Sequence, residues 1–226
     1  MKLIIQIPCL NERDHLGAAF AELPRQIPGV DRIEVLVIDD GSDDGTAEVA
    51  EALGAHHILR FPRNRDLAAA YAAGLDACLR LGADLIVNTD ADNQYPGADI
   101  ARLVAPILAG RADIVLGDRQ TDTIAHFSAT KRLLQRWGSS VVRRASGTRV
   151  TDTTSGFRAL SRRAAAALFV HNRFTYTLET IIQAGNAGLV LDEIKIRTNP
   201  ERRPSRLFRS IAAYVRRSGA VIVRAY

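Results

Sequence analysis

The chain has 226 residues, of which 47% are hydrophobic, and its 30 lysines and arginines against 25 acidic residues give a net charge of +5. This composition excludes a disordered chain and predicts one domain with a buried core and a tail. No uninterrupted apolar run reaches the roughly eighteen residues of a membrane span. Cys9 and Cys78 lack any CxxC or Cys/His pattern, which favours a reduced, cytoplasmic protein with both thiols in the core.

Strand and helix patterns alternate along the chain. The apolar runs 3–7 and 33–39 predict strands, the first being too short for a signal peptide, and helical spacing of apolar residues predicts a helix over 12–25. Further elements follow in this order: a helix from Asp44, a strand 58–61, a helix 66–81, a strand from Asp84, a helix 96–108, a strand 112–117, a helix 131–145, helices from Ser161 and Thr177, and a strand 190–196. This order predicts an α/β fold with a mostly parallel sheet and helices on both faces.

The stretch 84–94 joins an apolar strand to a polar end. Asp90, Asp92 and Gln94 follow the strand at its carboxyl end, where open α/β sheets bind ligands. Two carboxylates one residue apart are hard oxygen ligands, which suit Mg²⁺ or Mn²⁺ shared with a phosphate-bearing substrate. The alternative is a polar turn that only solvates the strand end.

Two other strand ends carry polar residues. Pro8 stiffens the exit from the first strand, and Asn11 can cap the helix that begins near Glu12. After the second strand, Asp39 and Asp40 can accept hydrogen bonds from a ribose or a base edge, or simply form a turn that caps the next helix. The chain lacks G-x-G-x-x-G and GK[ST], which disfavours dinucleotide-binding and phosphate-loop folds.

Four motifs follow one another along the chain: Pro8-x-x-Asn11-Glu12, Asp39-Asp40-Gly41-Ser42, Asp90-Ala91-Asp92 and Ser155-Gly156-Phe157-Arg158. In type and order they resemble the family 2 glycosyltransferases of the GT-A fold, within them most the dolichol-phosphate mannosyltransferase and polyprenyl-phosphate sugar transferase group. The resemblance covers nearly the whole chain. It implies a Rossmann-like nucleotide-binding half joined to an acceptor half, with Mg²⁺ or Mn²⁺ as cofactor.

The resemblance also implies roles for single residues. The metal and the donor's diphosphate would be held by Asp90, Asp92 and Gln94. The nucleotide of a GDP- or UDP-sugar would be bound by Pro8, Asn11, Glu12, Asp39, Asp40, Arg63 and Asp90. The phosphate of a polyprenyl acceptor would be bound by Arg119, Lys131, Arg132, Ser155 and Arg206. The catalytic residues would be Asp90, Asp92, Arg119 and Arg132.

Two segments depart from the family pattern. The loop 63–67 lacks the glycine that relatives have there, although its arginines can still meet a phosphate. Gly117-Asp118-Arg119 keeps the arginine of the family's Gly-Ser-Arg and adds a carboxylate beside the expected acceptor site.

Phe157 is either part of an acceptor loop or a core residue. Glu179 either orients a loop, contacts the sugar or acts as a helix-start carboxylate.

The reaction depends on the acceptor. The second pKa of a phosphate monoester is about 6, so a lipid phosphate is largely dianionic at neutral pH and hardly needs a base. Arginines would hold it in line with the departing nucleotide, and the anomeric carbon would be inverted. A saccharide or protein hydroxyl would need a carboxylate base, for which Asp118 and Asp152 are the candidates.

A basic tail, residues 198–226, follows the predicted domain of residues 1–197. Nine lysines and arginines and one acidic residue lie from Lys195 onward. As a helix from Ser205, the tail gathers arginines on one side and apolar residues on the other, which is typical of a helix in a membrane interface. A helix packed on the domain is the alternative.

These patterns predict a metal-dependent, inverting glycosyltransferase that transfers a sugar to a polyprenyl phosphate, peripheral to the cytoplasmic face of the membrane. Transfer to a hydroxyl acceptor is the second hypothesis. A basic nucleic-acid-binding module is the third, and no nucleic-acid partner is expected, since no helix-turn-helix, zinc-finger or RNA-binding signature accompanies the arginines.

Overall fold

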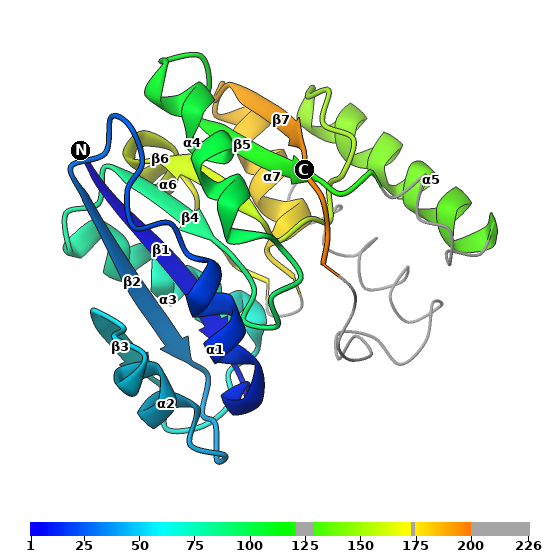
Figure 1. Ribbon diagram of the computed structural model, residues 1–226. Helices are drawn as coiled ribbons and strands as arrows, with labels where there is room; N and C mark the ends of the chain where they lie inside the picture. The colour runs from blue at the N-terminus through cyan, green and yellow to red at the C-terminus, as the bar shows by residue number, and fades with distance from the viewer. Residues whose placement is uncertain (121–128, 173–174, 200–226) are drawn as a thin grey trace.

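The computed structural model describes residues 1–120, 129–172 and 175–199, and for residues 129–137 it describes the backbone alone. Within these residues one sheet of seven strands runs through the domain in the order β3-β2-β1-β4-β6-β5-β7 (Figure 1). The strands are β1 (Lys2–Cys9), β2 (Arg32–Asp39), β3 (His57–Arg60), β4 (Leu85–Asn88), β5 (Ile114–Asp118), β6 (Arg158–Ser161) and β7 (Leu191–Lys195).

The sheet is parallel except at β6. β1 pairs in parallel with β2 and β4, β2 with β3, and β5 with β7, whereas β6 lies antiparallel between β4 and β5. The strands β1, β2, β4 and β5 therefore end at one edge of the sheet, and β6 begins there. This edge is where a doubly wound sheet binds ligands.

Helices cover both faces of the sheet (Figure 1). They are α1 (Arg13–Glu22), α2 (Thr46–Ala52), α3 (Leu67–Arg80), the short 3₁₀ turn η1 (Gly97–Asp99), α4 (Ile100–Leu108), α5 (Ala129–Ser146), α6 (Arg162–Ala167) and α7 (Thr177–Asn186). Helices α1 and α4 pack on one face, α3 and α6 on the other, and α5 packs against α7. None of the helices in the described ranges combines the length and the apolar character needed to cross a bilayer.

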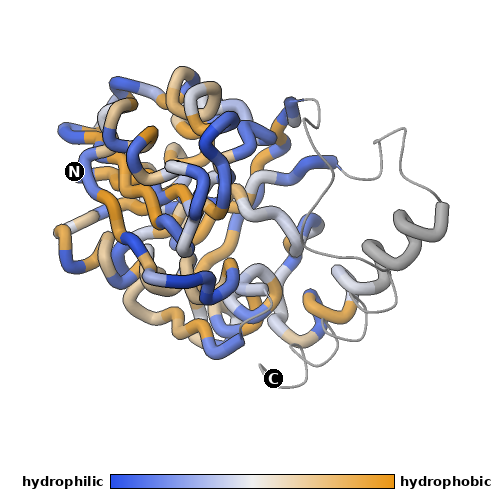
Figure 2. The backbone as a smooth tube through the Cα atoms, turned by 90° about the horizontal axis from the view of Figure 1, so that it is seen from below, coloured by the Kyte–Doolittle hydropathy of each residue, from blue (hydrophilic) through white to orange (hydrophobic). Residues whose placement is uncertain are grey.

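The continuous apolar runs in the sequence reflect burial on both faces. In β1, Leu3, Ile5 and Ile7 face α1 and α4, while Ile4 faces α3, and all four are fully buried. A strand covered on both sides needs apolar residues at successive positions rather than at alternate ones. Figure 2 shows these hydrophobic segments running through the middle of the domain.

The predicted α/β fold with a mostly parallel sheet is confirmed, but β6 is missing from the sequence prediction. The strand is four residues long and begins with Arg158, which is 1% exposed. A short strand that starts with a charged residue gives no periodic signal. The predicted helix over 96–108 is also divided, into η1 and α4.

Candidate functional site

Five segments meet at the edge where β1, β2, β4 and β5 end and β6 begins. They are 9–12, 39–46, 89–95, 118–120 and 152–157. The fold thus brings Asp39, Asp90 and Arg119, which are distant in the sequence, to the same edge of the sheet.

The turn after β2 buries two carboxylates. Asp39 accepts a hydrogen bond from the backbone N–H of Ser42 at 2.9 Å, and its other oxygen lies 3.2 Å from Nε of Arg60. Asp40 accepts the backbone N–H of Arg65 at 2.7 Å. Burial raises the pKa of Asp40 above its ordinary value, and the Arg65 N–H opposes the shift only in part. Perturbed carboxylates of this kind are common in binding sites.

Gly41 lets the loop 63–66 approach this turn. Its φ is +77°, and a Cβ at this position would lie 2.5 Å from the carbonyl carbon of Arg63. Only glycine allows the two backbones to come so close. The loop carries the exposed side chains of Arg63 and Arg65 past the buried carboxylates.

Asn11 joins the turn after β1 to the turn after β2. It has a φ of +54°, its N–H donates to Oγ of Ser42 at 2.9 Å, and its Oδ1 accepts the N–H of Asp43 at 3.1 Å. The N-cap of α1 is Glu12, which makes no side-chain cap hydrogen bond. The predicted capping of α1 by Asn11 is therefore wrong, because its side chain serves the neighbouring turn instead.

Pro8 and Glu12 lie on either side of this turn. Pro8 is half-buried and stands opposite Ile38 in the β1–β2 pairing. Glu12 is 5% exposed, its N–H donates to Oγ1 of Thr46 at 2.9 Å, and its carboxylate lies 3.3 Å from Nδ1 of His15. Both positions lie at the edge that holds Asp39 and Asp40.

The turn after β4 alternates accessible and buried side chains. Asp90, Asp92 and Gln94 are half-buried, whereas Ala91 and the other intervening residues are buried. Oδ1 of Asp92 accepts the N–H of Gln94 at 3.1 Å, which closes the turn. The three side chains predicted to hold a metal are therefore all partly accessible to solvent, unlike their neighbours in the turn.

The donor atoms of this turn fit a hard divalent cation. Two carboxylates and an amide oxygen are ligands that Mg²⁺ and Mn²⁺ accept, with the remaining positions left to water and phosphate. Space beside them is kept by Gly156, where a Cβ would lie 3.2 Å from Oδ1 of Asp90. The described residues contain no group of three or more His, Cys, Asp or Glu side chains able to hold a metal together.

The turn is also held from behind. Nδ2 of Asn93 donates to Oε1 of Glu22 at 2.8 Å. Asn199, after the last strand, donates from its backbone to the carbonyl of Gln94 and from its side chain to the carbonyl of Asn93, both at 2.9 Å. These contacts fix the backbone on which Asp92 and Gln94 stand.

Arg119 enters the edge from β5 as one half of a buried ion pair. Its Nε lies 2.7 Å from Oδ2 of Asp152, and its Nη2 donates to Oδ1 of Asp152 at 2.9 Å and to Oγ1 of Thr154 at 2.7 Å. The guanidinium holds the pKa of Asp152 below its ordinary value, although burial alone would raise it. Burial lowers the pKa of Arg119, but Tyr95 and Asp152 together raise it above its ordinary value. The ion pair and the bond to Thr154 hold the guanidinium by its Nε and Nη2 atoms.

The motif Ser155-Gly156-Phe157 leads into β6. Ser155 is fully buried, and its Oγ has no hydrogen-bond partner among the described residues. Phe157 is also fully buried and stacks on Tyr95 with ring centroids 5.1 Å apart, so it is a core residue. Glu179 accepts the N–H groups of His171 and Asn172, so it orients that loop.

Three residues predicted for the acceptor site fall outside this description. Lys131 and Arg132 lie in α5, where the backbone alone is described, and Arg206 lies outside the described residues. The contacts of their side chains therefore stay predictions.

No role was predicted for Asn88, for Asn199 or for the side chain of Arg158, although all three bind segments of the site. Asn88 is a fully buried amide in an otherwise apolar strand, and that contrast is a signal that could have singled it out. Arg158 belongs to a motif that the sequence did show. No sequence signal marks Asn199, because its partners are distant backbone carbonyls.

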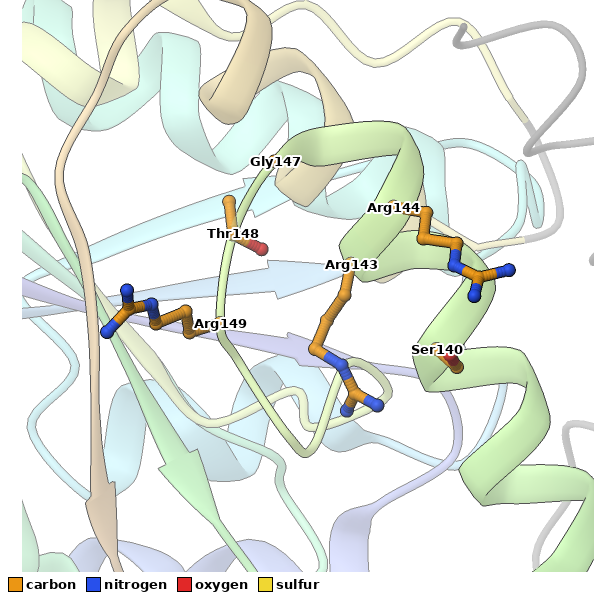
Figure 3. Close-up of a pocket in the computed structure, with 6 residues that line it drawn as sticks. All are labelled: Ser140, Arg143, Arg144, Gly147, Thr148 and Arg149. Atoms are coloured by element: carbon orange, nitrogen blue, oxygen red, sulfur yellow. The ribbon is translucent and has the colours of Figure 1, made fainter.

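A shallow pocket lies elsewhere on the domain, at the carboxyl end of α5. It measures about 540 Å³ and is lined by Ser140, Arg143, Arg144, Gly147, Thr148 and Arg149. Figure 3 shows the side chains of Arg144 and Arg149 extending in opposite directions, so their guanidinium groups do not converge on one ligand. None of the predicted site residues lines it.

Comparison with known families decides the class of this protein. The model of glycosyl transferase family 2 matches residues 4–169. This chain belongs to glycosyl transferase family 2. The predicted family and the prediction of a glycosyltransferase are therefore confirmed, and the strand-end edge lies at the place where this GT-A-like sheet brings its polar segments together.

Two relatives of this family 2 glycosyltransferase illustrate its neighbours in sequence. An uncharacterized protein of Methanocaldococcus jannaschii, MJ1222, is 31% identical over 205 residues, which are 87% of this chain and 81% of the relative. The polyprenol monophosphomannose synthase of Mycolicibacterium smegmatis is 30% identical over 168 residues. That match covers 71% of this chain and 62% of the synthase, so it leaves more than a third of the synthase unmatched.

A solved structure agrees in fold. Glucosyl-3-phosphoglycerate synthase from Mycobacterium tuberculosis, in complex with Mn²⁺ and UDP-glucose, superposes with a TM-score of 0.77 at 21% identity. The match covers 99% of this chain and 78% of the synthase. It supports the GT-A-like fold of this family 2 glycosyltransferase.

Proposed function

We propose that this family 2 glycosyltransferase moves a sugar from a GDP- or UDP-sugar to a polyprenyl phosphate, with Mg²⁺ or Mn²⁺ and with inversion at the anomeric carbon. The observation that carries the proposal is the Arg119–Asp152 ion pair, which lies at the same edge of the sheet as the acidic turn of Asp90 and Asp92. One side suits a metal and a diphosphate, and the other offers an arginine to a second phosphate.

The donor would bind along the ends of β1, β2 and β4. The buried carboxylates of Asp39 and Asp40, with Glu12 and Asn11, lie where hydrogen-bond donors of a nucleoside would enter. Pro8 would add backbone contacts, and Arg63 is placed to meet a phosphate. The named synthase from M. tuberculosis binds UDP-glucose with Mn²⁺, which supports a nucleotide-sugar and a divalent metal for this chain.

Asp90, Asp92 and Gln94 would hold the divalent cation. Bound there, the cation would supply Lewis-acid stabilisation to the departing nucleoside diphosphate. The protein's own contribution is to hold both carboxylates on the accessible side of a fixed turn.

The acceptor phosphate would be held by Arg119. Asp152 and Thr154 bond its Nε and Nη2 atoms, so the guanidinium is held rigidly, and we propose that its Nη1 side meets the phosphate. The buried hydroxyl of Ser155 at the same edge has no hydrogen-bond partner within the described ranges, and Lys131, Arg132 and Arg206 are proposed to complete the phosphate site. A dianionic phosphate attacking opposite the leaving diphosphate would invert the anomeric carbon.

The ion pair also argues against a general base at Asp152. A carboxylate with a lowered pKa and both oxygens bonded to arginine is a weak base. A phosphate nucleophile needs no such base, whereas a hydroxyl nucleophile does. The relative from M. smegmatis is named as a polyprenol monophosphomannose synthase, which supports a polyprenyl acceptor for this chain.

Transfer to a lipid would occur at a membrane surface, and we place it at the cytoplasmic face. The basic sequence 198–226 is proposed to provide the contact with the membrane, separate from the catalytic domain of residues 1–197. Most of this segment lies outside the described residues.

The test is an incubation of the protein with Mn²⁺, GDP- or UDP-sugars and a short-chain polyprenyl phosphate. We expect a lipid-linked sugar, with the opposite anomeric configuration to that in the donor. Product on a soluble sugar acceptor alone would refute the lipid-phosphate proposal while leaving the enzyme class intact.

Transfer to a hydroxyl is the second candidate because Asp118 remains available as a base. It is half-buried at the end of β5, where one carboxylate oxygen accepts the N–H of Gln120 at 2.8 Å. Asp118→Asn should leave transfer to a lipid phosphate within a few fold of wild type. A loss of several orders of magnitude with donor binding intact would favour the hydroxyl acceptor.

A further inference from the structure

Two buried amides cross the sheet beneath the site. Gln6 of β1 and Asn88 of β4 are paired in register, are both fully buried, and are joined by a hydrogen bond of 3.0 Å from Nε2 of Gln6 to Oδ1 of Asn88. Helix α3 leaves room for them at Gly74, where a Cβ would lie 2.4 Å from Oε1 of Gln6. An apolar pair would fill this layer at lower desolvation cost, so the amides call for another explanation.

Asn88 connects two sides of the site. We call the ends of β1, β2 and β4 the donor side, and the segments 118–120 and 152–157 the acceptor side. Its Nδ2 carries two hydrogens and donates to the carbonyl of Gly156 at 2.9 Å and to the hydroxyl of Tyr176 at 3.0 Å. Tyr176 itself stacks on Tyr71 with centroids 3.7 Å apart. One side chain, two residues before Asp90, therefore holds the segment that enters β6.

Arg158 holds the preceding carbonyl of the same segment. Its Nη2 donates to the carbonyl of Ser155 at 2.5 Å, its Nη1 donates to Oγ1 of Thr180 at 2.8 Å, and its Cζ lies 5.1 Å from the centroid of the Tyr176 ring. The carbonyls of Ser155 and Gly156 are thus both fixed from the core. Arg158 is 1% exposed, so it acts from inside the protein.

The segment 155–156 lies directly against the turn 90–94, which is proposed to hold the metal. A Cβ at Gly156 would be 3.2 Å from Oδ1 and 3.4 Å from Oδ2 of Asp90, and 3.1 Å from the hydroxyl of Tyr176. The position of this backbone therefore sets the distance between Asp90 and the acceptor side of the site, which carries Arg119 and Asp152.

We propose that Asn88 is a positioning residue that sets the acceptor segment 155–156 at a fixed place relative to Asp90, and so aligns the nucleophile with the donor sugar. The proposal rests on the proposed function for its two-sided site. Asn88 is buried and touches no substrate, so donor binding should survive its loss while alignment should not. Misalignment by about 1 Å can cost roughly a hundredfold in rate.

The experiment measures nucleotide affinity, kcat, KM, and the partition of donor between transfer and hydrolysis in Asn88→Ala and Asn88→Asp. Asn88→Asp keeps the shape and replaces the two donated hydrogens with an oxygen. We expect kcat for transfer to fall about a hundredfold, nucleotide affinity to change by less than about threefold, and the hydrolysed fraction to rise. A merely structural defect would instead lower nucleotide affinity, transfer and hydrolysis together.

Tyr176→Phe covers the case in which the Asn88 variants fail to fold. It removes only the hydroxyl that Asn88 bonds, and it should shift the partition in the same direction by a smaller factor. Gln183→Ala is the matched control, since this amide also ties a helix to a loop, through the N–H and carbonyl of Phe169. It should leave the partition unchanged.

Two results would overturn the proposal: transfer and partition close to wild type in folded Asn88 or Tyr176 variants, or nucleotide affinity lost in proportion to transfer. The partition is measured with whichever acceptor the wild-type protein uses, lipid phosphate or soluble sugar. A wild-type protein inactive on lipid phosphate would therefore refute the proposed function without deciding the role of Asn88.

Discussion

The two sides of the site, which we propose to bind the donor and the acceptor, hold their buried carboxylates in opposite ways. On the donor side, Asp40 is buried with the backbone N–H of Arg65 as its hydrogen-bond donor, and its pKa is raised by burial. On the acceptor side, Asp152 is buried against the guanidinium of Arg119, and its pKa is lowered. At neutral pH, ionised Asp40 therefore opposes folding, whereas ionised Asp152 favours it.

This difference indicates how each side meets its ligand. A buried carboxylate without a cationic partner can accept a hydrogen bond from the substrate or bind a metal that enters with it. An arginine already paired with a carboxylate is held in place and adds a phosphate with little rearrangement. The buried Asp40 on the donor side thus serves function at some cost in folding stability. On the acceptor side, Asp152 preorganises Arg119 before the ligand binds.

The largest effect is expected at the turn 90–94, the proposed metal site. Asp92→Ala should lower metal-dependent transfer by about a thousandfold, because a charged group facing the reacting centre is lost. The folded state should survive, since the side chain is half-buried and, within the described part of the chain, its hydrogen bond is to the N–H of Gln94. Steady-state rates across a Mn²⁺ titration, with circular dichroism, measure both. Asp76→Ala, an exposed carboxylate on α3, is the control, and Asp92→Ala with normal activity would remove the turn from the site.

Breaking the ion pair of the acceptor side comes next. Asp152→Asn should cost about 3 kcal/mol of unfolding free energy, because it leaves Arg119 buried without a counter-charge. Since the pKa of Asp152 is lowered in the folded state, this contribution should be full above the unfolded pKa of about 3.9 and should disappear as the pH falls through the folded pKa. Urea unfolding of both proteins from pH 7 downward measures it.

The same Asp152→Asn variant also tests whether Asp152 orients Arg119 or acts as a base. Transfer should weaken mainly through a higher KM for the acceptor, because the orientation of Arg119 is lost. A fall of several orders in kcat with normal acceptor binding would instead identify Asp152 as a base. Asp113→Asn, at the other end of β5, is the matched control.

Asp40→Asn should act in the opposite direction on stability. The raised pKa means that the favourable contribution of Asp40 exists below the unfolded pKa of about 3.9 and is lost as the pH rises through the folded pKa. The variant should therefore be more stable than wild type at pH 7 and lose that advantage in acid. Nucleotide affinity should fall roughly tenfold, since a charged acceptor is removed. Thermal unfolding and nucleotide titration test this, with Asp43→Asn as an exposed control in the same turn. Lower stability at pH 7 would contradict the contrast with Asp152.

The smallest effect on activity is expected at Glu34, away from the site edge. Its buried carboxylate lies 2.8 Å from Nζ of Lys2, 2.8 Å from Nε2 of His57 and 2.5 Å from Nε of Arg32. Burial raises its pKa, but the hydrogen bonds from Lys2 and His57 and the charges of Lys2 and Arg32 together lower it. Glu34→Gln should cost about 1–2 kcal/mol at pH 7, a loss that should fade below pH 4 or so as wild-type Glu34 also becomes neutral. Transfer rates should stay unchanged, and a large rate loss would show that stability and activity are not separable in this way.

The donor side could largely be predicted from the sequence, and the acceptor side could not. The strands that end at Asp39 and before Asp90 give continuous apolar runs, and parallel pairing then brings their ends together whatever the details. Arg119 was singled out, but its pairing with Asp152 is a long-range contact without a local signal. The strand that begins at Arg158 was missed because it is short, antiparallel and opens with a buried charge. The predicted capping role of Asn11 was wrong because its side chain bonds across to another turn rather than along its own helix.

The position of β6 also decides which part of the site can move. The segment 155–156 continues into a strand paired on both sides, by β4 and β5, so it behaves as a fixed wall. The loop 63–66 lies outside the sheet, is attached through Arg65 to Asp40, and ends at Asp66 with a φ of +75°. Opening and closing around a substrate is therefore expected on the donor side, with this loop as the cover, and amide hydrogen exchange should slow there when nucleotide binds.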